Sequence, residues 1–290
     1  MNSPLIVVVG ETASGKSALA MRLAQEFNGE IIAADSWTVR RGVDIGTAKP
    51  TAAERAAVPH HLLDVAGPKE DFTAAVFKKL ANEAITDISS RGKLPIMAGG
   101  TGLYVDGVIY DYSFLPSGDK NLRAELNEMT IKQLLKRIGK LGLDLGEVDT
   151  RNKRRLIRLI ENNGRLPTKH QLRDNTLLIG LKLERSELEE RISRRVDNMI
   201  KAGLEGEVRG LAARYGWDCE ALKGIGYTQW QDYFSGRQSL AETRQKIIKA
   251  TTDLAKRQRT WFKRNNCIQW FNTPVNWPNV VDLVTTFLES

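Results

Sequence analysis

Short apolar runs alternate with longer amphipathic stretches along the first third of the chain. Residues 5–9 (Leu-Ile-Val-Val-Val) form an unbroken apolar run that ends at a glycine, as expected of a fully buried strand. Further short strands are predicted at 30–34 and 94–98. Apolar residues at helical spacing predict helices from Ser14 onward and over 72–89. Alternating strands and helices indicate a parallel sheet with helices on both faces.

The pattern changes in the middle of the chain. Residues 114–175 are polar, with leucine-rich helical pieces, and predict a helical insertion. A strand is expected again at 177–183, helices at 187–213 and 241–265, a last strand at 267–271 and a closing helix at 280–288. The predicted fold is therefore α/β, with a core made of residues 1–113 and 176–290 and a helical insertion domain at 114–175.

Three motifs fall at the carboxyl ends of predicted strands, where ligands bind in open α/β sheets. The first matches the phosphate-loop pattern GxxxxGK[ST] and lies between a strand and a helix, the context that this motif requires. It predicts that the α/β core, residues 1–113 and 176–290, is P-loop NTPase-like and catalytic. Its glycines and backbone N–H groups suit a phosphate or diphosphate, the lysine adds a positive charge and the last hydroxyl is a candidate Mg²⁺ ligand at Ser17. The alternative is an ordinary strand–helix turn. The candidate diphosphate-binding residues are Gly10, Glu11, Thr12, Ala13, Ser14, Gly15, Lys16 and Ser17.

The other two motifs are Asp35-Ser36 and Gly99-Gly100-Thr101-Gly102. Asp35 is a candidate general base or a metal ligand through water, and a turn or helix-capping aspartate is the alternative. Thr101 is a candidate for a hydrogen bond to substrate, or it simply satisfies its turn. No carboxylate ends the 94–98 strand, which disfavours a motor ATPase or a small-molecule kinase. Glu11 places a carboxylate in the phosphate loop, which is mildly unfavourable unless the side chain points to solvent.

Positive charge is concentrated in the second part of the chain. Residues 1–115 carry 11 Lys and Arg against 13 Asp and Glu, whereas the whole chain carries 43 against 35. Residues 151–173 and 244–264 each hold eight Lys and Arg with a single acid. Such stretches, the second with Trp261 and Phe262, suit the phosphates and unpaired bases of a nucleic acid. Solvated helix faces, with the two aromatic residues in the core, are the alternative.

Histidines and cysteines point to no metal site or disulfide framework. His60 and His61 are adjacent on an extended segment, where their side chains point in opposite directions. The two cysteines, Cys219 and Cys267, have no metal-ligand spacing. No apolar run is long enough for a membrane span or a signal-peptide core. A cytoplasmic protein without a membrane partner is therefore expected, and nothing in the sequence requires more than a monomer.

Segments spread along nearly the whole chain resemble, in order, the motifs of the tRNA dimethylallyltransferase family. They are residues 10–17, Asp35-Ser36, 42–50 (Gly-Val-Asp-Ile-Gly-Thr-Ala-Lys-Pro), 59–64 (Pro-His-His-Leu-Leu-Asp), 98–104 (Ala-Gly-Gly-Thr-Gly-Leu-Tyr), 154–158, 224–227 and 255–261. The set is highly specific, although each segment beyond the phosphate loop is weak alone.

The resemblance implies a Mg²⁺-dependent prenyl transfer. The phosphate loop would hold dimethylallyl diphosphate, and Asp35 would take a proton from N6 of the adenine 3′-adjacent to the anticodon. Thr101 and Arg123 match positions near the transfer site and the tRNA. The insertion would clamp the anticodon stem-loop. The tRNA-binding residues implied are Asp35, Ser36, Trp37, Thr38, Thr101, Arg123, Arg154, Arg155, Lys256, Arg257 and Gln258.

The chain departs from the family pattern at three positions. Thr38 stands where a base-contacting glutamine is usual, Arg40 replaces a tyrosine and Glu11 replaces a proline. Two alternatives therefore accompany the prediction: an adenylate isopentenyltransferase, which prenylates a free nucleotide, and a tRNA-binding homologue with reduced activity. The long insertion and the basic stretch that ends at Arg264 favour tRNA over a free nucleotide.

Overall fold

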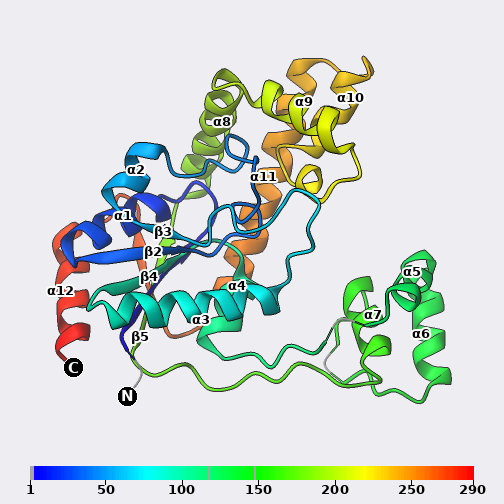
Figure 1. The fold of residues 1–290 in the computed structure, drawn as a ribbon, viewed down its shortest axis with the longest axis horizontal. Coiled ribbons are helices and arrows are strands. Elements are labelled where there is room, and N and C mark those ends of the chain that lie inside the picture. The colour runs from blue at the N-terminus through cyan, green and yellow to red at the C-terminus, as the bar shows by residue number, and fades with distance from the viewer. Residues whose placement is uncertain (1–2, 117, 147) are drawn as a thin grey trace. The chain divides into compact units, whose positions relative to one another are not determined.

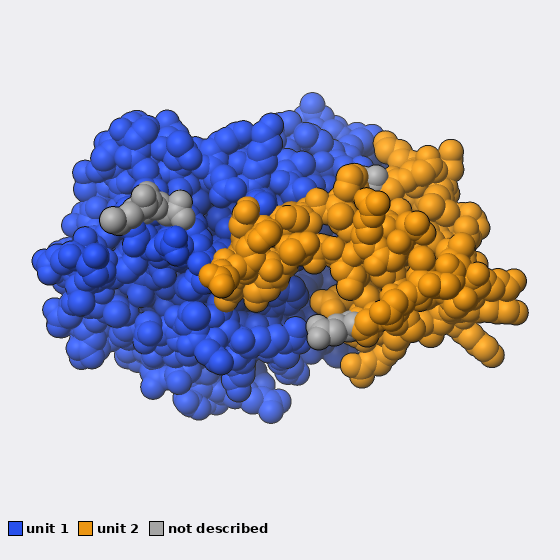
Figure 2. All heavy atoms as spheres, turned by 90° about the horizontal axis from the view of Figure 1, so that it is seen from below, with its two compact units in different colours: residues 1–109, 172–290 blue, residues 110–171 orange. Residues whose placement is uncertain are grey.

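A computed structural model describes residues 3–116, 118–146 and 148–290 of the chain. They divide into two compact units, coloured separately in Figure 2. The first unit combines Met1–Ile109 with Leu172–Ser290, and the second is Tyr110–Gln171. The helical insertion expected over residues 114–175 overlaps this second unit.

Within the described residues, six parallel strands form one sheet in the order β3-β2-β4-β1-β5-β6 (Figure 1). Strand β1 lies inside the sheet because all six of its residues are buried and can pack on both faces. The α/β fold predicted from the apolar runs is confirmed. The strands are β1 (Leu5–Gly10), β2 (Gly29–Ala33), β3 (His60–His61), β4 (Leu94–Ala98), β5 (Thr176–Lys182) and β6 (Ile268–Asn272).

Helices cover both faces of the sheet. Ile6 and Val8 of β1 pack in one cluster with Leu23 of α1 (Lys16–Glu26) and with Val280 of α12 (Trp277–Glu289). Alternate residues point the other way, and Val7 is equally buried. On that face the sheet contacts α3 (Ala74–Ser90) and α11 (Leu240–Phe262), which also contact α4 (Gly102–Ile109).

The prediction of one helix at 187–213 is wrong in one respect, because the structure has two helices there. Gly203 lies between α8 (Arg185–Lys201) and α9 (Leu204–Tyr215) with a φ of 99°, a left-handed conformation that interrupts a helix and that glycine adopts readily. Several short elements were not predicted from the sequence. They are α2 (Ala52–Ala57), β3, α4, the 3₁₀ helices at Glu220–Lys223 and Thr228–Trp230, and α10 (Gln231–Phe234).

The second unit contains α5 (Lys120–Glu128), α6 (Ile131–Lys140) and α7 (Lys153–Glu161). Its core is separate from that of the sheet: Leu126, Leu134 and Leu156 are fully buried in one cluster. Thr130 and Gln133 form a capping box at the start of α6. Each helix thus contributes a single apolar stripe to a small bundle core, as the leucine spacing predicts.

Glu30 is a buried carboxylate at the start of β2. Arg91 donates two hydrogen bonds to it, of 2.5 and 2.7 Å, and His61 Nε2 lies 2.7 Å from its Oε2. The Arg91 hydrogen bonds, with further help from His61, lower the pKa of Glu30 to about 2. Both histidines of the predicted pair lie in β3, and His60 bonds the Val58 carbonyl instead.

Glu30→Gln is expected to lower the free energy of unfolding by about 3 kcal/mol at pH 7, from the lowered pKa of the carboxyl. Because that pKa is depressed in the folded state, its stabilisation is present above about pH 4.5 and disappears as the pH falls towards about 2. Urea unfolding at pH 7 and pH 3 measures the difference. Asp87→Asn is the control, since this exposed partner of Arg91 is expected to contribute less than about 1 kcal/mol. An equal deficit at both pH values would contradict the assignment.

Candidate prenyl-transfer site

The phosphate loop has the backbone geometry that its glycines predict. Gly10 has a φ of 146°, and a Cβ there would lie 2.5 Å from the Leu181 carbonyl oxygen, so the loop can leave β1 only at a glycine. Gly15 has a φ of 94° and forms the N-cap of α1 without a side-chain cap. The first N–H groups of α1 therefore point out of the helix with positive potential, as an anion site needs.

Lys16 is turned back onto its own loop. Its Nζ donates a hydrogen bond of 2.6 Å to the Glu11 carbonyl oxygen. Burial and then the nearby charge of Arg195 lower the pKa of Lys16 to about 8, although Asp35 and Glu11 act in the opposite direction. An anion bound here would relieve both unfavourable effects on the charged lysine.

Glu11 does not point to solvent. Its carboxylate is 2% exposed and receives hydrogen bonds of 2.6 and 2.9 Å from Arg259 on α11. The same guanidinium donates to the Leu183 carbonyl after β5. The charge of Glu11 is thus compensated by a cation rather than by water, and the pair ties the phosphate loop to α11.

Gln258 also joins the phosphate loop to α11. Its Oε1 accepts a hydrogen bond of 2.8 Å from Thr12 N, and its Nε2 donates one of 3.0 Å to the Gly100 carbonyl. The resemblance assigned Gln258 to tRNA binding, but both ends of its amide are used within the protein. A Cβ at position 100 would lie 2.2 Å from Nε2, so this approach requires a glycine.

Asp35 follows β2 and is held by the backbone after it. Its Oδ1 accepts a hydrogen bond of 2.8 Å from Trp37 N and a longer one from Thr38 N. No hydrogen bond reaches Oδ2 from the described residues. One carboxylate oxygen therefore forms the turn that a capping aspartate would form, while the other remains able to accept a proton.

Thr101 lies beside the Asp35 turn. Its Oγ1 accepts a hydrogen bond of 3.0 Å from Ser36 N and lies 3.4 Å from Ser36 Oγ. These contacts bring together two of the loops that were predicted to meet at the carboxyl edge of the sheet. Thr38, at the position of the usual glutamine, is buried and its hydroxyl donates to the Asp35 carbonyl.

Two cavities of the first unit meet at these residues. The larger, of about 1140 Å³, is lined by Lys16, Ser17 and the start of α1. The smaller, of about 370 Å³, is lined by Trp37, Thr101, Arg257 and Trp261. Phe262, by contrast, is buried. The residues that line both cavities are Thr12, Asp35, Thr47, Gly100, Arg195, Met199 and Gln258.

Arg195 was not predicted as a site residue. It lies on α8, lines both cavities and donates a hydrogen bond of 3.2 Å to the Thr47 carbonyl. Burial lowers its pKa, and the nearby charge of Asp35 partly offsets this. Arg195 thus places a second cation beside Lys16.

The remaining predicted residues lie outside these cavities. Arg123, on α5 of the second unit, makes a two-point ion pair with the fully buried carboxylate of Glu161. Arg154 and Arg155 are exposed on α7, and Lys256 is exposed on α11. Their assignment to tRNA stays a prediction.

In the described ranges, no group of three or more His, Cys, Asp or Glu side chains could hold a metal ion. Among the same residues, no helix is long and apolar enough to cross a membrane.

Comparison with known proteins identifies the family. A sequence model described as IPP transferase matches residues 38–265. The chain is 41% identical over 296 residues to tRNA dimethylallyltransferase 1 of Citrifermentans bemidjiense. The alignment covers 98% of this chain and 97% of that protein. It is 41% identical over 283 residues to the tRNA dimethylallyltransferase of Anoxybacillus flavithermus, covering 94% and 91%.

Solved structures of similar proteins indicate the same family. The full-length tRNA isopentenylpyrophosphate transferase of Bacillus halodurans matches with a TM-score of 0.77 and 37% identity, over 99% of this chain and 97% of that one. A eukaryotic dimethylallyltransferase acting on tRNA matches with a TM-score of 0.78 and 25% identity, over 93% and 74%. With a family model across most of its length and relatives above 40% identity, this chain belongs to the IPP transferase family of prenyltransferases.

Proposed function

We propose that the protein transfers a dimethylallyl group from dimethylallyl diphosphate to N6 of the adenine 3′-adjacent to the anticodon of a tRNA. The observation that supports this most directly is that Asp35 lines both cavities, one with the phosphate loop and one with aromatic and basic side chains. A donor held by its diphosphate and a base held by stacking would meet at this carboxylate. The names of the relatives point to the same reaction.

The residues divide the reaction between them. The adenine N6 attacks C1 of the dimethylallyl group, the C1–O bond breaks and the diphosphate leaves. Lys16, Arg195 and the N-terminus of α1 stabilise the charge that develops on that diphosphate. The Oδ2 atom of Asp35 takes the proton that N6 loses. The target adenine must leave its stack to enter the smaller cavity.

Ser17 fits the role of a Mg²⁺ ligand. It is exposed in the first turn of α1 and lines the larger cavity with the Asp35 carboxylate, so oxygen donors face the same space. When bound, Mg²⁺ would neutralise part of the diphosphate charge. The remaining ligands would come from the diphosphate and water.

Labelled dimethylallyl diphosphate with Mg²⁺ and an unmodified anticodon stem-loop tests the proposal, with AMP and ATP in parallel reactions. Label in the stem-loop alone supports it. Label in AMP would make the protein an adenylate prenyltransferase. Tight, salt-sensitive tRNA binding without transfer would mark a binder whose Thr38 and Arg40 substitutions have removed activity.

Arg195→Ala is expected to lower kcat/KM for the donor by about 10–100-fold, as for a lost hydrogen bond to a charged group. Stem-loop affinity should change less than donor affinity, although Arg195 lines both cavities, because the target base is expected to be held by stacking rather than by a cation. Steady-state kinetics with varied donor measure the effect. Arg185→Ala is the control, since Arg185 is an exposed residue of α8 paired with Glu189. Equal effects of the two substitutions would refute a role for Arg195 at the diphosphate.

A further inference from the structure

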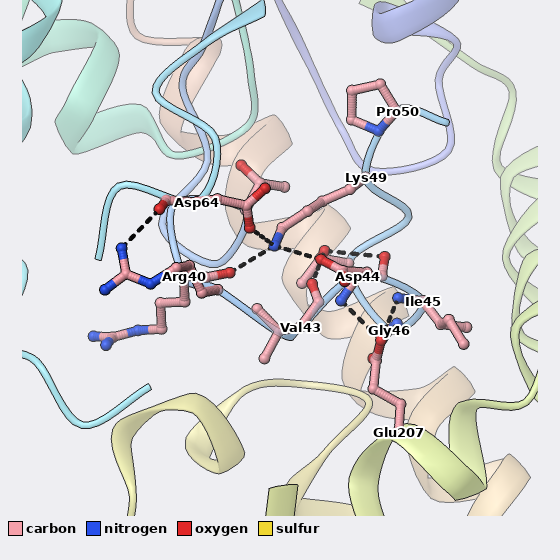
Figure 3. Close-up of polar contacts among 12 residues, drawn as sticks. Arg40, Val43, Asp44, Ile45, Gly46, Lys49, Pro50, Asp64 and Glu207 are labelled. Carbon is pink, nitrogen blue, oxygen red and sulfur yellow. Dashed lines mark hydrogen bonds and ion pairs between the residues drawn. The ribbon is translucent and has the colours of Figure 1, made fainter. Parts of the chain in front are cut away.

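The segment of residues 43–50 connects the two cavities. Gly46 and Thr47 line the smaller one, and Asp44, Thr47 and Lys49 line the larger one. No helix or strand is formed here, and Ala48 has a φ of 50°. Side chains anchor the segment to the rest of the first unit, and Figure 3 shows the contacts of Lys49 and Glu207 that do so.

At one end, Lys49 is buried among oxygen atoms. Its Nζ donates to the Arg40 carbonyl at 2.6 Å, to Asp44 at 2.7 Å and to Asp64 at 2.5 Å (Figure 3). Arg55 also donates to Asp64 at 3.0 Å. Two carboxylates face two cations, so the charges of this cluster balance one another.

At the other end, the carboxylate of Glu207 on α9 accepts hydrogen bonds from the backbone of residues 44–46. Its Oε2 accepts hydrogen bonds from the N–H groups of Asp44 and Ile45, at 2.9 and 2.8 Å. Its Oε1 accepts one of 3.1 Å from Gly46 N, as Figure 3 shows, and one of 2.6 Å from the Tyr227 hydroxyl. One carboxylate thus satisfies three consecutive backbone donors.

Tyr227 completes this contact. The residue is fully buried, and a Cβ at position 46 would lie 2.6 Å from its ring, so the ring packs directly on Gly46. Burial and then the charge of Glu207 raise the pKa of Tyr227. Its hydroxyl therefore stays protonated and donates to Glu207.

The next residue in the segment contacts the transfer site. Thr47 follows Gly46, and its carbonyl oxygen accepts the hydrogen bond from Arg195. Among the described residues, Thr47 is the one that accepts a hydrogen bond from the Arg195 guanidinium. The position of this guanidinium beside Lys16 and Asp35 thus depends on where residues 44–47 lie.

We propose that Glu207, which contacts neither cavity, is a positioning residue: through residues 44–47 it holds the Arg195 guanidinium where the leaving diphosphate binds. This inference takes from the proposed function only the identity of the ligand, which is a diphosphate. Its test therefore measures the binding of inorganic pyrophosphate with Mg²⁺, which requires no transfer. A residue that only stabilises the fold would act independently of Arg195.

Two substitutions remove different parts of the contact. Glu207→Gln keeps one oxygen for two backbone donors but places an N–H₂ group against Gly46 N–H. Tyr227→Phe removes a single hydroxyl from an otherwise unchanged ring. Glu205→Gln is the matched control, because Glu205 lies in the same turn of α9 and pairs with the exposed Arg209.

Calorimetric titration is expected to give a pyrophosphate Kd about tenfold higher for Glu207→Gln, about threefold higher for Tyr227→Phe and within about twofold of wild type for Glu205→Gln. In an Arg195→Gln background, Glu207→Gln should change Kd by less than about twofold, since both substitutions remove one interaction. Thermal unfolding of every variant is measured alongside.

Additive effects of Glu207→Gln and Arg195→Gln would overturn the proposal, and so would a wild-type Kd in both Glu207→Gln and Tyr227→Phe. If Glu207→Gln does not fold, Tyr227→Phe with and without Arg195→Gln decides the matter by the same criterion. The two proposals can fail separately. If the Kd values follow the expected pattern but the wild-type protein does not prenylate the stem-loop, the proposed function is refuted and the positioning role of Glu207 stands.

Discussion

Asp35→Asn is expected to lower the rate of prenyl transfer by about 10²–10⁴-fold, the usual range for loss of a general base. The amide cannot take the proton from N6, but its oxygen can still accept the hydrogen bond from Trp37 N. Stem-loop affinity is expected to stay within about tenfold of wild type, because the carboxylate acts mainly in the transition state. Single-turnover transfer and stem-loop binding measure the two quantities.

Comparison with Asp35→Ala separates the two roles of this side chain. Alanine removes both the base and the turn-forming oxygen, and loss of such a cap costs about 1 kcal/mol of stability. If Asp35 is the base, both variants are inactive and only the alanine variant unfolds more easily. An active Asp35→Asn beside an inactive Asp35→Ala would show instead that the residue serves the turn.

The sequence predicted every strand of the described sheet except β3, because most of these strands are short apolar runs with a clear end. Residues 5–9 are apolar throughout, as an interior strand requires, and the phosphate-loop motif marks where β1 becomes α1. The very short β3 has no such run, and it is recognised only through its pairing with β2. Gly203 was a local signal for the division between α8 and α9 that the prediction did not use.

The site was predictable where its chemistry is local and not where it depends on distant contacts. Nothing near Glu11 in sequence shows that Arg259, 248 positions away, compensates its charge. The same holds for Gln258 and Thr12. Long-range pairs of this kind require the folded chain.

Arg195 is an intermediate case, since a signal existed. It lies among charged residues on α8, but it is three residues after the buried Ile192 and four before the buried Met199. Helical spacing therefore puts it at the edge of the buried face, unlike its exposed neighbour Arg194. Helical phase would have distinguished the exposure of the two arginines, which charge alone could not, although Arg194 also lines the larger cavity.

Lys16→Met is expected to lower kcat/KM for the donor by about 10²–10³-fold, because it removes a charge from the place where the leaving diphosphate develops its own. Methionine keeps most of the length and the apolar stem of lysine. The donor KM should rise and stem-loop affinity should stay unchanged. Steady-state kinetics with varied donor check this, and an unchanged donor dependence would contradict the diphosphate role of the loop.

The pH dependence gives the same lysine a second test. With a pKa of about 8, Lys16 in the free protein is mostly charged at pH 7 and only about 10% charged at pH 9. Diphosphate binding favours the charged form, so affinity is expected to be full below pH 8 and to fall as the pH rises through 8. The Lys16→Arg variant keeps its charge across this range. The ratio of pyrophosphate Kd values for the two proteins cancels the ionisation of the ligand, and parallel profiles would show that Lys16 does not bind the anion.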